Sequence, residues 1–167
     1  MNTDGAGGGG SADAGVPGIE RVAVLGAGSM GHGITEVVAM AGYDVTMRDV
    51  EADIVEEGYE RIEWSLGKLA EADRLEESPG AVLDRIDTAV DLETAVAGAD
   101  LVIEAAPEQL ELKREIFADL DEFTGEDAIL ASNTSSLSIT EIAGATARPE
   151  RVCGLHFFNP PVKMELV

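Results

Sequence analysis

Two polar motifs in the last third of the chain carry side chains suited to acid–base chemistry. His156 begins the run His-Phe-Phe-Asn-Pro, and a neutral imidazole can accept a proton from an alcohol near neutral pH. Residues 132–136 read Ser-Asn-Thr-Ser-Ser, which can form a turn with a helix cap, donate hydrogen bonds to a ligand, or do both. A single histidine is more often structural. We therefore interpret His156 as a candidate base only if the fold places it beside this polar run.

A glycine-rich turn near the start of the chain predicts where a dinucleotide would bind. An apolar run of strand length leads into Gly26-Ala-Gly-Ser-Met-Gly31, and helix-compatible residues follow. In this pattern Gly26 makes the sharp turn, Gly28 lets a pyrophosphate approach bare backbone, and Gly31 lets the helix pack closely on the strand. The phosphates would lie at the positive end of the helix dipole, beside Ser29 and Met30.

Asp49 stands at the end of the next expected strand, near the spacing of the acid that binds the adenosine ribose. A carboxylate there accepts hydrogen bonds from both ribose hydroxyls and repels a 2′-phosphate, which favours NAD over NADP. The competing interpretation is that Asp49 caps the following helix. Arg48 is expected to point to the opposite face of the strand, so it does not indicate NADP.

Glu104 lies within an apolar strand, where a carboxylate without partners would be costly to bury. We expect backbone donors or a nearby lysine or arginine to satisfy it. The turn that follows contains Glu108 and should lie along the cofactor, because the carboxyl ends of parallel strands face the ligand crevice. Lys113, on the next helix, either contacts the cofactor or pairs with a neighbouring side chain such as Glu108.

The balance of charge excludes some classes of partner. The chain has 33 acidic and 11 basic residues and a formal net charge of −22, so it should repel nucleic acid and anionic membranes. This acidity indicates either a solvated surface that keeps the protein soluble or, as we favour, adaptation to high salt. No apolar run is long enough to cross a membrane, the start lacks a signal-peptide pattern, and His32 has no metal-spaced partner. We therefore expect a cytoplasmic protein without a metal site.

Short apolar strands alternate with longer amphipathic stretches from residue 20 onward. This pattern predicts an α/β fold, a doubly wound and mostly parallel sheet of the Rossmann type. Residues 1–19, rich in Gly, Ala and Asp, are predicted to be a disordered tail, and residues 20–167 the nucleotide-binding domain. The expected strands lie near 21–26, 43–48, 86–89, 100–105, 128–131 and 151–156, and a long helix is expected over 51–74.

The single cysteine, Cys153, falls in the last of these expected strands. One cysteine cannot form an internal disulfide, which is consistent with a reducing compartment. Its apolar neighbours predict a buried, inert thiol rather than a nucleophile.

Four motifs together resemble a known family. The glycine turn, the run Glu104-Ala-Ala-Pro-Glu, the run Ser132-Asn-Thr-Ser-Ser-Leu and the run His156-Phe-Phe-Asn-Pro occur in the same order in the amino-terminal domain of the 3-hydroxyacyl-CoA dehydrogenases. The resemblance covers nearly everything from residue 20 to the end. The glycines agree with it, and the separation of the serine-rich and histidine motifs makes it specific.

The resemblance implies oxidation of a (3S)-3-hydroxyacyl-CoA to the 3-ketoacyl-CoA, with hydride transfer to NAD, in fatty acid β-oxidation. By matching motif, His156 would be the general base that removes the hydroxyl proton. Ser135 would hydrogen-bond the substrate oxygen beside the nicotinamide. Glu108, Lys113 and Asn159 would contact the cofactor.

The resemblance is less complete on the CoA side. Ser65, on the long helix, matches a family position near the CoA moiety. A family lysine close by is replaced here by Ala72, so Lys68 on the same helix is the candidate to supply that contact. An ordinary solvated lysine is an equally good interpretation of Lys68.

One family residue falls outside this sequence. The family pairs its catalytic histidine with a glutamate whose position would follow Val167, and Glu165 is out of phase with it on an alternating strand. The family's helical carboxy-terminal domain, which usually carries the dimer interface, would also follow these residues. We therefore expect little or no turnover from these residues alone, and a homodimer for the full-length form.

Two alternative functions stay open. The first is a non-catalytic NAD(H)-binding regulatory module of the same fold, suggested by the missing glutamate and helical domain. The second, less favoured, is a dehydrogenase of related fold that acts on a small hydroxy acid or sugar acid.

Overall fold

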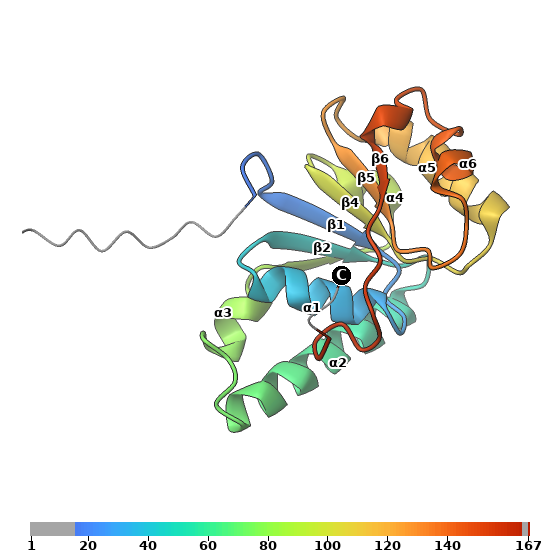
Figure 1. Cartoon of the computed structure of the whole chain (residues 1–167). Coiled ribbons are helices and arrows are strands. Elements are labelled where there is room, and N and C mark those ends of the chain that lie inside the picture. Colours follow the sequence, from blue (N-terminus) through green and yellow to red (C-terminus); the bar gives the residue numbers. More distant parts are fainter. Residues whose placement is uncertain (1–15, 165–166) are drawn as a thin grey trace, which may run out of the picture.

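A computed structural model describes residues 16–164 and residue 167 (Figure 1). The sheet has six strands in the order β3-β2-β1-β4-β5-β6, and every neighbouring pair is parallel. The predicted α/β, doubly wound fold is confirmed, with a sheet that is parallel throughout. The strands are β1 Arg21–Leu25, β2 Asp44–Arg48, β3 Ile86–Ala89, β4 Leu101–Glu104, β5 Ile129–Ser132 and β6 Val152–Gly154.

Helices cover both faces of this sheet (Figure 1). One face carries α1, α2 and α3, and the other carries α4, α5 and α6. The helices are α1 Gly31–Met40, α2 Ala52–Glu71, α3 Pro79–Leu83, α4 Leu92–Val96, α5 Leu110–Phe123 and α6 Ile139–Ala143, and a 3-10 turn spans Pro149–Arg151. The long helix expected over 51–74 is α2, which ends three residues earlier than expected, at Glu71.

Each face of the sheet has its own hydrophobic core, because successive strand residues point to opposite sides. In β1, Val22 and Val24 pack with α1 and α2, whereas Ala23 and Leu25 pack with α4 and α5. A central strand buried on both faces reads as a continuous apolar run, which is why the sequence pattern located it.

The strand order reverses between β1 and β4, and this reversal creates the site. After β1 the chain builds outward through β2 and β3, then crosses to β4 and builds the other way. Connections leaving the carboxyl ends of β1 and β4 go to opposite sides, and the resulting crevice is where sheets of this class bind ligands. The turns after β1, β2, β4, β5 and β6 all lie at this carboxyl edge of the sheet.

The predicted disordered tail covers residues 1–19, and residues 1–15 of it lie outside the described residues. Residues 16–19 are described: the Val16 N–H donates to the Tyr43 hydroxyl at 2.8 Å, and Ile19 packs against the hydrophobic core. Glu165 also falls outside the described residues.

The prediction that the Cys153 thiol is buried is wrong, because this side chain is exposed. It lies on β6, the edge strand of the sheet, where Val152 and Gly154 face α6 and Cys153 points to the other side. Helices α1 and α2 cover that side nearer the centre of the sheet. The apolar neighbours therefore predicted a strand correctly, but an edge strand buries only one of its faces.

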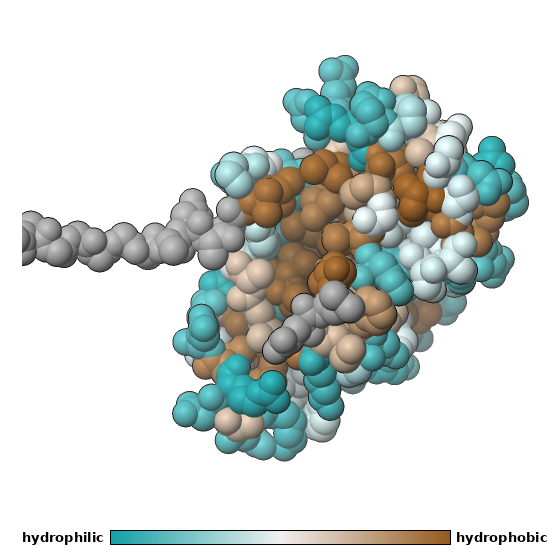
Figure 2. Space-filling model, viewed as in Figure 1, coloured by the Kyte–Doolittle hydropathy of each residue, from teal (hydrophilic) through white to brown (hydrophobic). Residues whose placement is uncertain are grey.

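The segment after β6 returns across the sheet edge and runs beside α1 (Figure 1). Pro161 packs against this helix at Gly33, where an added Cβ would lie 3.0 Å from the proline Cδ. Apolar residues gather across the middle of this face, between more hydrophilic regions (Figure 2). Among the helices described here, none has both the length and the hydropathy to span a bilayer.

Candidate active site

The glycine turn between β1 and α1 has the shape that a phosphate needs. Gly26 has φ +107°, and a Cβ there would lie 2.7 Å from the Ala105 carbonyl oxygen. A Cβ on Gly31 would lie 1.6 Å from the Gly26 carbonyl oxygen. Both glycines are thus required by the protein's own backbone. Gly28 has nothing within 4 Å of the same position, so open space lies over the turn where the first amides of α1 begin.

Asp49 ties the end of β2 to this turn. Its Oδ2 accepts the Ala27 N–H at 2.8 Å and its Oδ1 accepts the Val50 N–H at 2.7 Å. The cap of α2 is Glu51, without a side-chain hydrogen bond, so Asp49 does not cap that helix. Arg48, expected to face away, also lines the groove beside Asp49, and its Nε donates to the Val90 carbonyl. Alternation along a strand does not restrain a long side chain at the strand end.

Two cavities meet along the crevice. The first, of about 590 Å³, is called here the nucleotide groove, and its lining includes five predicted residues: Gly26, Gly28, Ser29, Met30 and Asp49. The second, of about 280 Å³, is called the His156 cleft, and its lining includes six: Met30, Glu108, Lys113, Ser135, His156 and Asn159. Met30, Ala105 and Ala106 line both cavities, which are therefore neighbours. Gly31 lies beneath the turn and packs α1 on β1.

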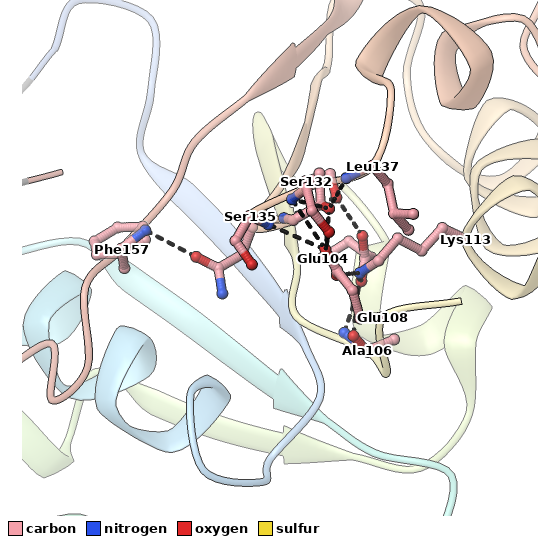
Figure 3. A network of polar contacts seen from close by, with 11 residues as sticks. Glu104, Ala106, Glu108, Lys113, Ser132, Ser135, Leu137 and Phe157 are labelled. Atoms are coloured by element: carbon pink, nitrogen blue, oxygen red, sulfur yellow. Dashed lines mark hydrogen bonds and ion pairs between the residues drawn. The ribbon is translucent and has the colours of Figure 1, made fainter. Parts of the chain in front are cut away.

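The fold brings the two polar motifs to one place. Strands β5 and β6 are adjacent and parallel, so the turns that follow them lie side by side. Asn133 joins these turns, because its Oδ1 accepts the Phe157 N–H at 2.8 Å (Figure 3). The His156 ring packs at a tilt on Phe158, with centroids 4.9 Å apart. Sequence reasoning gave Asn133 no individual role, although it stands in the polar run that was singled out.

Glu104 is fully buried and has three donors (Figure 3). Lys113 Nζ lies 2.6 Å from Oε1, the Ala106 N–H donates to the same oxygen at 2.7 Å, and the Ser132 hydroxyl donates to Oε2 at 2.6 Å. The expectation that backbone donors or a basic side chain would satisfy it is confirmed, since it has both. The carboxylate thereby links the ends of β4 and β5.

Lys113 is 1% exposed and lies between two carboxylates. Besides Glu104, its Nζ donates to the Ala106 carbonyl at 3.1 Å and lies 3.5 Å from Glu108 Oε2. Of the two interpretations of this lysine, pairing with acidic side chains is the one present in the structure. Its contact with the cofactor stays a prediction.

The amino-acid sequence of residues 21–167 matches the family model described as 3-hydroxyacyl-CoA dehydrogenase, NAD binding domain. The chain belongs to this family. The resemblance drawn from the motifs is confirmed, and NAD is the cofactor of this family's amino-terminal domain.

Relatives within the 3-hydroxyacyl-CoA dehydrogenase family are close in sequence. A 3-hydroxybutyryl-CoA dehydrogenase of Bradyrhizobium diazoefficiens is 47% identical over 150 residues, which cover 89% of this chain and 51% of the relative. The mitochondrial hydroxyacyl-coenzyme A dehydrogenase of Rattus norvegicus is 44% identical over 156 residues, with 89% and 49% covered. The chain thus spans about half the length of the curated relatives it matches.

Solved structures of the family agree with the fold. The 3-hydroxybutyryl-CoA dehydrogenase from Escherichia coli K12 superposes with a TM-score of 0.84 at 42% identity, over 87% of this chain and 31% of that chain. FadB2 of M. tuberculosis superposes with a TM-score of 0.81 at 44% identity, over 85% of this chain and 50% of that chain.

The two residues predicted for the CoA side lie apart from both cavities of this dehydrogenase domain. Ser65 donates to Glu36 Oε1 at 2.7 Å, across the contact between α2 and α1. Lys68 pairs with Glu71 on the exposed side of α2, with 2.7 Å between Nζ and Oε2. Both CoA contacts stay predictions.

Glu36 is a buried acid that sequence reasoning missed. It is 1% exposed, and burial raises its pKa to about 7, although the Ser65 hydroxyl acts in the opposite direction. Because the folded protein then holds this proton more tightly than the unfolded chain, wild-type stability should fall as pH rises from about 4.5 to 7 and stay lower above that range.

Substituting Glu36→Gln should remove this penalty, because the amide is neutral and can still accept from Ser65. We expect the variant to be more stable than wild type by about 1–3 kcal/mol at pH 8 and nearly equal at pH 4.5. Urea unfolding at both values measures the difference. Glu63→Gln, on the exposed side of α2, is the matched control and should show no such pH-dependent gain. An equal effect of Glu36→Gln at both pH values would contradict the assignment.

A larger groove, of about 760 Å³, lies elsewhere, between α2 and β3. Four carboxylates contribute to its lining: Glu56, Glu60, Glu63 and Asp87. They would repel the phosphates of a dinucleotide, so this groove does not compete with the crevice for NAD. Within residues 16–164, no three His, Cys, Asp or Glu side chains gather as a metal site would need.

Proposed function

We propose that this chain is the NAD-binding half of an enzyme that oxidises (3S)-3-hydroxyacyl-CoA to the 3-ketoacyl-CoA. The observation that carries the proposal is the His156 cleft: it adjoins the nucleotide groove, and both Ser135 and His156 line it. A group bound between them would be held next to the cofactor's reactive end. The names of the relatives describe the same class of reaction.

The chain's own residues suit the proton half of this reaction. Bound NAD supplies the hydride acceptor. Ser135 donates a hydrogen bond to the substrate oxygen, and the His156 imidazole takes the hydroxyl proton as the carbonyl forms. The glycine turn, Asp49 and the amides of α1 hold the dinucleotide, while Glu108, Lys113 and Asn159 border its nicotinamide end.

We place the CoA moiety beside Ser65 and Lys68 on α2, by their match to family positions. We assign the full-length enzyme to fatty acid β-oxidation and expect a homodimer formed through the helical domain of the family. These assignments rest on the family's longer members, because the chain spans about half the length of such a protein.

The direct test is oxidation of NADH by acetoacetyl-CoA, measured at 340 nm with the longest available form of the chain. We expect saturable, CoA-dependent oxidation, and little with free acetoacetate. Binding of NADH without oxidation would favour a non-catalytic NAD(H)-binding module instead. Equal rates with acetoacetate would favour a dehydrogenase acting on small hydroxy acids.

Asp49→Asn tests the ribose assignment. The amide can still hold the Ala27 N–H but accepts less strongly from the two ribose hydroxyls and no longer repels a 2′-phosphate. We expect the Kd for NADH to rise roughly tenfold or more and the preference over NADPH to shrink. Fluorescence titration with both nucleotides measures this. Asp44→Asn, at the opposite end of β2, should bind both as wild type does, and an unchanged Kd in Asp49→Asn would refute the assignment.

A further inference from the structure

The turn after β5, which carries Ser135, is gathered around one carboxylate oxygen from the turn after β4. Glu108 Oε1 accepts the Ser135 N–H at 3.1 Å, the Ser136 N–H at 3.3 Å and the Ser136 hydroxyl at 3.2 Å. The Thr134 hydroxyl donates to the same oxygen. Thr134 Oγ1 in turn accepts the Leu137 N–H at 3.0 Å, so the whole turn converges on Glu108 (Figure 3).

Lys113 pairs with Glu108 at the carboxylate oxygen that the turn does not use. Its ammonium lies 3.5 Å from Glu108 Oε2 and 2.6 Å from Glu104 Oε1. Glu104 anchors Ser132, the last residue of β5, through its other oxygen. The polar run is thus fixed at its start by one carboxylate and in its middle by another, and one buried lysine serves both.

The charge of Glu108 is maintained by this arrangement. Partial burial raises the pKa of Glu108, but the Thr134 hydroxyl, the Lys113 charge and the Ser136 donors outweigh it and leave the pKa below its usual value. The carboxylate therefore stays ionised near neutral pH, and hydrogen bonds to an ionised acceptor are stronger than neutral ones.

We propose that Glu108 is a positioning residue for Ser135, acting through the backbone of the turn, with Lys113 as the counter-ion it shares with Glu104. This rests on the proposed role of Ser135. Four donors already use Oε1, so a contact with the cofactor would be left to Oε2, which faces Lys113. Glu108 Oε1 thus holds the backbone of Ser135 and with it the position of that side chain, while any contact with the cofactor falls to Oε2.

The test compares Glu108→Gln with Glu111→Gln in 15N-labelled protein. Glu108 is 39% exposed and its loss leaves Lys113 paired with Glu104, so the variant should fold. The control, Glu111, is 77% exposed and pairs with Arg114 on the outside of α5. Amide hydrogen exchange, amide shifts as a function of pH, and NADH affinity are measured for each.

In wild type and Glu111→Gln, the amide shifts of Ser135 and Ser136 should titrate with a carboxylate whose pKa is below the usual value. In Glu108→Gln we expect that titration to vanish and exchange at both amides to be roughly ten- to a hundredfold faster. Any rise in the Kd for NADH should accompany this loosening of the turn. In a form of the enzyme with turnover, kcat should fall while KM is nearly unchanged.

Unchanged exchange and titration in Glu108→Gln would overturn the proposal, as would a tenfold loss of NADH affinity with the turn intact. Hydrogen exchange and pH titration of the amides report on the turn itself, so they test the role of Glu108 even if no acetoacetyl-CoA is reduced. A lack of turnover in wild type would count against the proposed function alone.

Discussion

Replacing Lys113 with methionine is expected to lower the free energy of unfolding by about 3–5 kcal/mol. The substitution keeps most of the side chain's volume but leaves Glu104 as a fully buried carboxylate without its counter-ion. Two donors would remain, the Ala106 N–H and the Ser132 hydroxyl, and they do not neutralise the charge. Urea unfolding followed by circular dichroism measures the loss.

The matched control is Lys68→Met, because Lys68 forms an ion pair of similar length on the solvent-exposed side of α2. Exposed pairs contribute about 0–1 kcal/mol, so its effect should be small. Adding Glu104→Gln to Lys113→Met should restore most of the stability, since the amide is neutral and can still accept from Ala106. If the double variant were as unstable as Lys113→Met, the loss would come from packing rather than from the buried charge.

Replacing His156 with glutamine is expected to lower acetoacetyl-CoA-dependent oxidation of NADH by about 10²- to 10⁴-fold, the usual contribution of a general base or acid. Glutamine keeps a polar side chain in the His156 cleft but cannot exchange a proton near neutral pH. Affinity for NADH should stay close to wild type, because the nucleotide groove does not include His156.

Cys153→Ser serves as the control for this experiment. Cys153 lies on β6, three residues before His156, which follows the end of that strand. Cys153 is exposed and lines neither cavity. Its variant should turn over as wild type does. Retention of most activity by His156→Gln would remove the histidine from the mechanism, and a parallel loss in Cys153→Ser would indicate a general disturbance of β6.

Local sequence patterns were enough to predict the architecture. Short apolar runs alternating with amphipathic stretches determine strands and helices residue by residue, and such signals need no knowledge of distant contacts. The glycine turn was predictable from its motif, and the contact of Gly31 with Gly26 lies within the turn itself. The close approach of the Ala105 carbonyl to Gly26 comes instead from the distant strand β4. The ribose role of Asp49 and the base role of His156 stay predictions.

Long-range packing decided what local patterns left open. The sequence did not determine whether Lys113 pairs with neighbours on its helix, with the cofactor or with Glu104. The partner depends on where α5 lies against β4. The position of β6 at the edge of the sheet lets Asn133 accept the Phe157 N–H and leaves Cys153 exposed. Ser135 and His156 line one cleft because β5 and β6 are adjacent and parallel, which brings turns far apart in the chain to the same end of the sheet.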